Sequence, residues 1–355
     1  MADLVVIDGS GGGGQMVRNA VALSAVSGRP VRVVNIRGAR PRPGLRPQHL
    51  MAVKAAAHAC SGRLTGAELG SREIELHPRE IGAPGQWAVD VGTAGSLMLV
   101  LQCVLPALAC AAAQFRMTLI GGTDVPFAPP FDHFREVFLP ALAEMGPRVE
   151  ARLVRRGFYP KGGGEVEVTV APAGAIRPVS WCERGAVSRI SGRAYSLGLP
   201  GHIVERMRKA ALDALARAGH GDAQIESEVV ARGRSEGCGI VLWADCDGGR
   251  IGASALGRRG KRAEEVGEEA ASALVEELEA GGAVDSRLAD QMIVWMALAD
   301  GASELTTSGL TDHIRSAVEV AEAVVGARFS LYEGPPARVR CEPLPVGERA
   351  DAPGC

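Results

Sequence analysis

Residues 4–28 read LVVIDGSGGGGQMVRNAVALSAVSG: a short apolar run, a glycine-rich loop and a segment with helical spacing. Val17, Ala20 and Val21 recur at intervals of three and four residues, so the stretch predicts a strand, a loop and a helix. Such a loop lets a ligand phosphate approach the backbone closely, although four consecutive glycines match neither the dinucleotide fingerprint nor the P-loop lysine motif. A flexible turn before a packed helix is the alternative interpretation.

The same pattern recurs further along the chain. Residues 88–111, AVDVGTAGSLMLVLQCVLPALACA, again predict a strand, a glycine turn and an apolar helix, and a looser copy begins near Leu288. Repeated units of this kind indicate a domain assembled from similar modules. Gln102 is the polar residue among the Leu and Val of the second unit, so it either finds a hydrogen-bond partner inside the fold or faces a cleft.

The length and composition favour an α/β (α+β) protein with about two domains. The 355 residues are 46% hydrophobic but only 4% aromatic, which describes a core of small and branched aliphatic side chains. After Pro178 the residue pattern changes, and an apolar helical pattern like that of the first half returns near Met292. We therefore expect a large domain at 1–182 and 281–340, an inserted small domain at 183–280 and a C-terminal tail at 341–355.

Charge and targeting features favour a cytoplasmic protein. A formal net charge of −2 argues against a protein that coats long nucleic acid, while it allows a local basic site. The apolar segment 97–113 is interrupted by Gln102 and Pro106, so we expect a buried helix and no membrane span. The first residues lack the pattern of a secretory signal, and the eight cysteines form no CxxC pair, so free thiols in a reducing cytoplasm are expected.

Residues 36–57, IRGARPRPGLRPQHLMAVKAAA, combine four arginines with three prolines ahead of a helical pattern. The prolines keep the loop extended, and Pro47 stands where the first helical turn begins. Guanidinium groups and free backbone N–H groups at a helix N-terminus together suit a polyphosphate ligand. A solvated basic loop is the alternative.

Two further loops carry candidate ligand-binding groups. Residues 121–134, GGTDVPFAPPFDHF, predict an irregular loop that forms one wall of a binding site. Phe127 or Phe131 of this loop could stack on a base, although proline-rich loops are more often simple connectors. Residues 155–170, RRGFYPKGGGEVEVTV, predict a glycine turn and an alternating strand, with Arg156 and Lys161 placed to face a phosphate.

Residues 305–325, LTTSGLTDHIRSAVEVAEAVV, predict a helix capped by Thr311 or Asp312, with His313 in its first turn. The positive end of the helix dipole disfavours a charged imidazole there, so we expect His313 to stay neutral. Neutral imidazole is a nucleophile. A satisfied surface histidine is the alternative interpretation.

Taken together, these motifs resemble the RNA 3′-terminal phosphate cyclase family along nearly the entire chain. The resemblance rests on DGSGGGGQ followed by Arg18, the arginine-rich stretch, GTAGS with LVLQCVLPAL, GGTDVPFAPP, RRGFYPKGGGE, LADQ at 288–291, and His313 after LTTSG. It implies a large domain of three repeated modules, each with two helices on a four-stranded sheet, and a smaller inserted α/β domain.

The resemblance also implies an activity. Enzymes of this family are ligases in RNA processing that use ATP to convert an RNA 3′-phosphate end into a 2′,3′-cyclic phosphodiester, releasing AMP and pyrophosphate. Adenylylation of a histidine comes first, AMP then passes to the RNA 3′-phosphate, and the 2′-hydroxyl finally displaces it. The implied cofactors are ATP and Mg²⁺ or Mn²⁺, and the implied partner is the RNA 3′-phosphate end, with no obligate protein partner.

Carried over residue by residue, the family's nucleophile falls on His313. Its nucleotide-site residues fall on Arg18, Arg37, Arg40, Gln48, Gln102, Pro129, Pro130, Asp290 and Gln291. One departure concerns the metal. The family usually carries a glutamate four residues before the glutamine of its glycine loop, and this chain has Gly11 there. Metal ligands are therefore left unassigned.

Two other functions stay open at this point. A nucleolar branch of the same family lacks the nucleophile and serves as a ribosome-assembly factor, and the presence of His313 argues against that role. Enolpyruvyl transferases also use repeated β–α modules and arginine-rich anion sites. Neither of these proteins is expected to form a covalent adenylate.

Overall fold

The computed structural model describes residues 3–82 and 85–344. It contains four sheets of four strands each, and three of these sheets share one topology. In each of the three, the first two strands along the chain pair in parallel, and the other two pairings are antiparallel. The predicted α/β class with repeated four-stranded modules is confirmed.

The first module contains the glycine loop and the arginine-rich stretch. Its sheet has the order β1-β2-β4-β3, from β1 (Val5–Asp8), β2 (Val31–Val34), β4 (Ile74–His77) and β3 (Arg63–Thr65). Its helices are α1 (Gly14–Ser27) and α2 (Pro47–Ala59). Pro47 is the first residue of α2, as predicted, because a first-turn N–H needs no helical partner.

The second module repeats this order. Its sheet, β5-β6-β8-β7, contains β5 (Gln86–Asp90), β6 (Phe115–Gly121), β8 (Gly164–Ala171) and β7 (Arg148–Arg155). Its helices are α3 (Leu97–Ala109) and a composite helix made of α4 (Phe131–His133), the π-helix η1 (Phe134–Phe138) and α5 (Leu139–Glu144). The apolar segment predicted as a buried helix is α3.

The third module is split in the sequence. Its sheet, β15-β16-β14-β9, contains β15 (Arg328–Tyr332), β16 (Ala337–Glu342), β14 (Ser303–Thr307) and β9 (Ser180–Trp181), with helices α8 (Ser286–Leu298) and α9 (Asp312–Val325). A long insertion separates β9 from α8. The copy near Leu288 therefore looks incomplete in the sequence, because its first strand is short and distant along the chain.

The intervening residues form the fourth sheet. Its strand order is β11-β10-β12-β13, from β10 (Val187–Leu197), β11 (Gln224–Val230), β12 (Gly237–Cys246) and β13 (Gly249–Leu256). Two helices, α6 (Gly201–Arg217) and α7 (Ala263–Glu279), cover one face of this sheet. A hydrophobic core of its own, drawn from residues 190–278, lies between this sheet and its helices. The larger core belongs mainly to the three modules.

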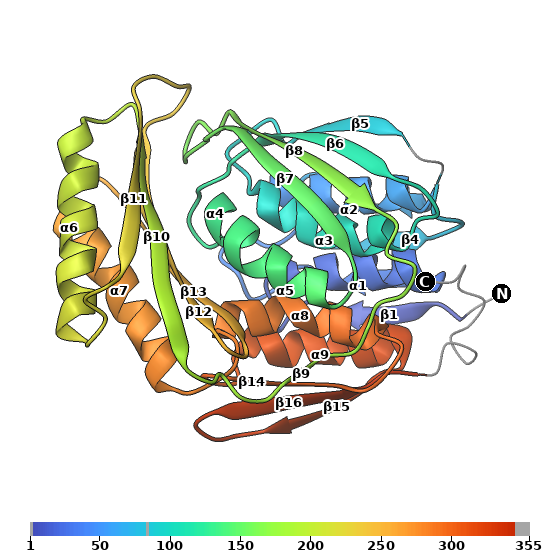
Figure 1. The fold of residues 1–355 in the computed structure, drawn as a ribbon. Helices are drawn as coiled ribbons and strands as arrows, with labels where there is room; N and C mark the ends of the chain where they lie inside the picture. The colour runs from blue at the N-terminus through green and yellow to red at the C-terminus, as the bar shows by residue number, and fades with distance from the viewer. Residues whose placement is uncertain (1–2, 83–84, 345–355) are drawn as a thin grey trace.

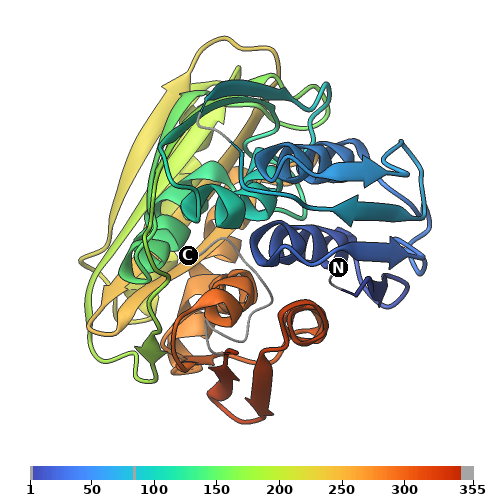
Figure 2. The same cartoon turned by 90° about the vertical axis from the view of Figure 1, so that its right-hand side faces the viewer.

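The helices of the three modules gather in the interior with their sheets on the outside (Figures 1 and 2). α1 packs against α2, α3 and α9, and α8 packs against α9. This arrangement brings the N-termini of α1 and α9 together, although these helices begin at Gly14 and Asp312, far apart in the sequence.

A buried ionic cluster joins the second module to the fourth sheet. The Arg156 guanidinium contacts Asp132 Oδ2 at 2.7 Å and Glu228 Oε2 at 2.9 Å, and lies 3.7 Å from the centre of the Tyr195 ring. The Tyr195 hydroxyl donates to Asp124 at 2.7 Å. Arg156 is therefore not available to a phosphate, and that prediction was wrong. Because Arg156 is buried, it needs these carboxylate partners.

The structure also bears on three smaller expectations, which concern the C-terminal tail, the cysteines and membrane-spanning helices. β16 includes residues 341 and 342, so these two do not belong to a tail, and residues 345–355 lie outside the described ranges. Cys60, Cys103, Cys182, Cys238 and Cys246 are thiols, whereas Cys110 is disulfide-bonded. Within residues 3–82 and 85–344, no helix is both long enough and apolar enough to cross a membrane.

Candidate active site

His313 stands in the first turn of α9, half exposed, next to a carboxylate from α8. The Thr311 hydroxyl caps the helix by accepting from the backbone N–H of Ile314 at 3.1 Å. His313 Nδ1 lies 3.3 Å from Asp290 Oδ2. This contact occupies Nδ1 and leaves Nε2 as the ring nitrogen that is open to a ligand.

The Asp290 contact also sets the protonation of His313. The hydrogen bond with Asp290 raises the pKa of His313 above its ordinary value, against the opposing effects of burial and of Arg18 and Arg40. The carboxylate therefore opposes the helix dipole, which was expected to favour the neutral imidazole. A contact with a full negative charge outweighs the partial charge at a helix end.

Gln15, in the first turn of α1, connects the glycine loop to this pair. Its Nε2 donates to Asp290 Oδ1 and, at 3.2 Å, to the carbonyl oxygen of His313. Asp290 therefore uses one oxygen for Gln15 and the other for His313. The sequence motifs contain Gln15 without indicating a role for it, because its partners lie on α8 and α9.

Arg18 and Arg40 supply positive charge on the glycine-loop side of the site. Arg18 is buried on α1, and this burial lowers the pKa of its guanidinium while Cys103 and Asp290 oppose the effect. Arg40 lies along Gly13, where an added Cβ would come within 3.4 Å of Nη2. The absence of side chains in this loop therefore allows a guanidinium to approach its backbone.

The Arg37 guanidinium is hydrogen-bonded within the arginine-rich loop. Its backbone has a φ of 55°, and its Nη1 donates to the carbonyl oxygens of Arg42 at 2.7 Å and Gly44 at 2.9 Å. Burial lowers the pKa of Arg37, with Arg46 and Arg40 adding to the effect. Arg37 thus fixes the loop that carries Arg40.

His49 is a site residue that sequence reasoning missed. It is buried on α2, and its Nδ1 accepts from the backbone N–H of Arg46 at 3.3 Å. Burial lowers the pKa of His49 to about 3, and Arg18, Arg37 and Arg46 add to this. His49 is therefore neutral at physiological pH. A Cβ on Gly14 would come within 2.0 Å of His49 Nε2, so His49 packs directly under the start of α1.

Gln48 joins the first and second modules. Its Oε1 accepts from the backbone N–H of Ser96 at 3.0 Å, and Gly95 packs against its Cβ. Ser96 in turn caps α3 by accepting from the N–H of Leu99 at 3.3 Å. Gln48 therefore ties the GTAGS loop to the end of the arginine-rich loop.

Gln102 faces a small polar pocket of about 20 Å³ between α1, α3 and α8. The pocket is lined by Gln15, Arg18, Asn19, Gln102, Asp290, Gln291, Val294 and Trp295. Among the described residues, four buried amide atoms here lack a hydrogen-bond partner: Gln15 Oε1, Asn19 Nδ2, Gln102 Nε2 and Gln291 Oε1. Buried amides normally find partners, so this pocket offers hydrogen bonds to a ligand or to ordered water.

Pro129 and Pro130 are not among the residues that line this pocket. Pro130 precedes α4 as its N-cap, and Pro129 is only partly buried. Phe131 is fully buried and cannot stack on a base, whereas Phe127 is fully exposed. The structure therefore leaves Phe127 as the one of these two phenylalanines that a ligand can reach.

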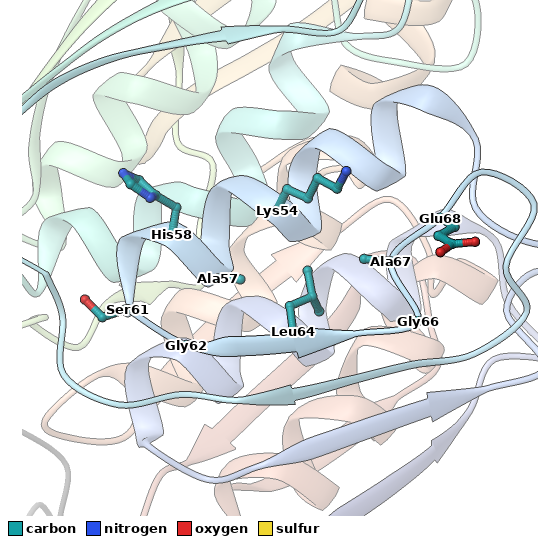
Figure 3. A pocket seen from close by; sticks show the side chains of 9 residues that line it. All are labelled: Lys54, Ala57, His58, Ser61, Gly62, Leu64, Gly66, Ala67 and Glu68. Atoms are coloured by element: carbon teal, nitrogen blue, oxygen red, sulfur yellow. The ribbon is translucent and has the colours of Figure 1, made fainter.

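A second, larger and more open pocket of about 590 Å³ lies between α2 and β3 (Figure 3). Lys54 and His58 from α2 face it, together with Leu64 and Glu68 from β3 and the turn that follows. None of the residues expected to bind the nucleotide lines this pocket. Its size alone does not make it the reactive site.

A sequence model of the family described as RNA 3′-terminal phosphate cyclase matches residues 10–331. The chain belongs to the RNA 3′-terminal phosphate cyclase family. It is 43% identical over 335 residues to the RNA 3′-terminal phosphate cyclase of Pyrobaculum neutrophilum, covering 94% of this chain and 96% of that protein. It is 45% identical over 323 residues to the cyclase of Ignicoccus hospitalis, covering 89% and 91%.

Among solved structures, this family member is similar to the enolpyruvyl transferase NikO from Streptomyces tendae at 12% identity and a TM-score of 0.39. The match covers 96% of this chain but spans about half of the other, 48%. At that score the likeness is too weak to assign a shared fold or function.

Proposed function

We propose that this protein is an ATP-dependent RNA 3′-terminal phosphate cyclase whose nucleophile is His313. The observation that carries the proposal is the chain of contacts from Gln15 to Asp290 to His313 Nδ1 beside Arg18 and Arg40. It combines an oriented imidazole with guanidinium groups, which together suit attack on a phosphoryl group.

In the first step, the lone pair on His313 Nε2 attacks the α-phosphorus of ATP. An N–P bond forms, and the bond from the α-phosphorus to the bridging oxygen breaks, releasing pyrophosphate. Asp290 holds the Nδ1 proton, so it fixes the tautomer and stabilises the positive charge that the ring acquires. Arg18 and Arg40 stabilise negative charge on the phosphoryl oxygens.

In the second step, an oxygen of the RNA 3′-phosphate attacks the same phosphorus and His313 leaves as neutral imidazole. The neighbouring 2′-hydroxyl then attacks the 3′-phosphorus and loses its proton to solvent, the bond to AMP breaks, and the cyclic phosphodiester closes. The requirement for a 2′-hydroxyl makes RNA, and not DNA, the cyclisable substrate. Without activation, ring closure would have to expel an oxide ion from the 3′-phosphate. Adenylylation by ATP provides AMP as a better leaving group, so it must precede ring closure.

The remaining residues are proposed to hold the nucleotide. Gln102, Asp290 and Gln291 line the polar pocket, where unpartnered amide atoms are available to polar groups of AMP. Arg37, Gln48 and His49 are proposed to position the loops that carry Arg40 and the GTAGS turn. Pro129 and Pro130 are proposed to lie near the base, on the loop that precedes α4.

Mg²⁺ or Mn²⁺ is proposed to arrive with ATP. Within the described ranges, no group of three His, Cys, Asp or Glu side chains is arranged to hold a metal ion. This fits Mg²⁺ held mainly by phosphate oxygens and water, as is common at nucleotide sites. The ion would neutralise phosphate charge.

The test is covalent labelling with α-labelled ATP and Mg²⁺. We expect one label per chain, labile in acid and stable in base, as a phosphoramidate requires, and its transfer to a 3′-phosphorylated RNA. A protein that bound ATP and RNA without retaining covalent label would fit an assembly factor and contradict the proposal. An absence of both label and cyclic product would leave a transferase of another class as the better explanation.

A further inference from the structure

A second candidate surface lies where the turn between β7 and β8 meets the fourth sheet (Figure 1). A Cβ on Gly162 would come within 2.8 Å of Ala94 Cα, and one on Gly163 within 2.8 Å of Arg234 Cδ. The backbone N–H of Phe158 donates to Ser235 Oγ at 2.8 Å. The glycines of this turn therefore allow three loops to meet: residues 93–96, residues 157–163 and residues 231–236.

Two aromatic side chains leave this junction into solvent. Phe127 is 103% exposed and Tyr159 is 67% exposed. Asp124 forms a parallel bridge with Phe158, so Phe127 and Tyr159 follow the bridge on adjacent segments. Phe127 also has a φ of 65°, which is rare for a bulky residue and is found where function maintains strain. Packing within the protein does not account for either side chain.

Three exposed cations lie on the loops of this junction, Lys161 on residues 157–163 and Arg232 and Arg234 on residues 231–236. Lys161, Arg232 and Arg234 are exposed, and within residues 3–82 and 85–344 none of them has an ion pair or a side-chain hydrogen bond. Neighbouring carboxylates are already used, because Glu165 pairs with Arg155 and Glu228 with Arg156. Glu236 adds one exposed negative charge nearby, so the junction keeps an excess of positive charge.

The junction is continuous with the proposed active site. Residues 93–96 contact Gly162 on one side and, through Gly95 and Ser96, Gln48 on the other. Gln48 follows the arginine-rich loop that carries Arg40. A chain leaving the active site across the GTAGS turn would therefore reach the exposed aromatics next.

We propose that this junction, defined by Phe127, Tyr159, Lys161, Arg232 and Arg234, binds the unpaired nucleotides that precede the reacting 3′ end of the RNA. The proposal rests on the proposed function and extends it to the body of the substrate. Exposed aromatic rings stack on unpaired bases, and unpaired cations bind the phosphates between them. Folding of the protein by itself offers no comparable reason for combining exposed rings with free cations.

The experiment compares two substrates and two variants. The substrates are a 3′-phosphorylated dinucleotide and a 3′-phosphorylated single strand of about 12 nucleotides, a length within the usual range of such sites. The variants are Tyr159→Ala, and Arg232→Ala with Arg234→Ala. For the long RNA we expect KM to rise about tenfold or more in the tyrosine variant, because loss of a single base stack has about that effect. We also expect KM to rise in the arginine variant, because two cations no longer bind the phosphates of the RNA.

Self-adenylylation and cyclisation of the dinucleotide should stay at the wild-type level in both variants, since neither change touches the nucleotide site. For the arginine variant we also plot the logarithm of the long-RNA binding constant against the logarithm of the salt concentration. The slope should become less steep by about 0.7 for each phosphate that is no longer neutralised. The matched control is Arg328→Ala with Tyr332→Ala, which removes an arginine and an exposed tyrosine from β15 in the third module. This control should bind the long RNA as wild type does.

Unchanged KM for the long RNA in both junction variants, or an equal rise in the β15 control, would overturn the proposal. Failure of the proposed function is distinguishable, because the wild-type protein would then carry no covalent AMP, while direct binding of the long RNA to the wild type and the variants can still be compared. Crosslinking of RNA with a photoreactive base near its 3′ end should label peptides containing Phe127 or Tyr159. Labelling confined to other peptides would also count against the junction.

Discussion

Asp290 Oδ2 lies 3.3 Å from His313 Nδ1, and this pair joins the middle of α8 to the first turn of α9. The contact has a measurable consequence, because a carboxylate at this distance favours the protonated imidazole. Only neutral imidazole can attack ATP. The pH profile of self-adenylylation therefore reports on the pair.

We expect the rate of self-adenylylation to fall on acidification with a midpoint above about 6.5, the ordinary pKa of histidine. The sign follows from the raised pKa of His313, whose largest cause is the hydrogen bond with Asp290. In Asp290→Asn the midpoint should move to lower pH, while the maximal rate falls because the tautomer is no longer fixed. A profile with the same midpoint in both proteins would show that Asp290 does not control this titration.

Replacing His313 tests the nucleophile directly. Because the side chain is half exposed, His313→Ala and His313→Asn should leave the denaturation midpoint nearly unchanged. Both should lose self-adenylylation by at least about 10³-fold, as removal of a catalytic nucleophile does. Asparagine keeps polarity, so a substantial residual rate in His313→Asn alone would indicate an orienting role. RNA supplied already adenylylated at its 3′-phosphate should still be cyclised by either variant.

The glycine loop offers a matched pair of substitutions. Gly11 has open space where a side chain would extend, whereas a Cβ on Gly14 would collide with buried His49. We expect Gly11→Glu to fold, to keep self-adenylylation and to increase the dependence on metal concentration, since it places a carboxylate where the family resemblance implies one. Gly14→Ala should destabilise the protein by about 1–3 kcal/mol, as overpacking does. Denaturant midpoints measure the stability of both variants, and Mg²⁺ titrations of self-adenylylation measure the metal dependence of Gly11→Glu. A folded Gly11→Glu protein without self-adenylylation would mean that this loop positions ATP differently.

The buried position of Arg156 predicts a large effect on stability. Arg156→Ala leaves Asp124 buried without a guanidinium partner, whereas Asp132 keeps its pairs with Arg193 and Arg135. Loss of one partner of a buried pair costs about 3–5 kcal/mol. The control is Arg152→Ala, which breaks the exposed 2.7 Å pair with Glu167 and should cost at most about 1 kcal/mol. Chemical denaturation of both variants measures the difference. Similar losses in the two would mean that the buried cluster contributes little.

Local sequence patterns predict the elements that carry the site. Apolar spacing and Pro47 indicate the start of α2, and Thr311 provides the cap that places His313 in the first turn of α9. These features depend on residues within one or two helical turns, so the chain itself contains the whole cause. The module repeat is also visible, although the interruption after β9 disguises its third copy.

Such local patterns do not predict the charge state of the site. His313 acquires a raised pKa from Asp290 on another helix, and His49 is held neutral by burial beside arginines from two other segments. Arg156 reads in the sequence as an exposed loop cation, yet it is buried against carboxylates far away in the chain. Desolvation and through-space charge depend on distances that only the packed helices establish. The sequence by itself therefore determined the elements, the repeat and the candidate residues, whereas the tertiary structure decided which of them are charged, buried or open to a ligand.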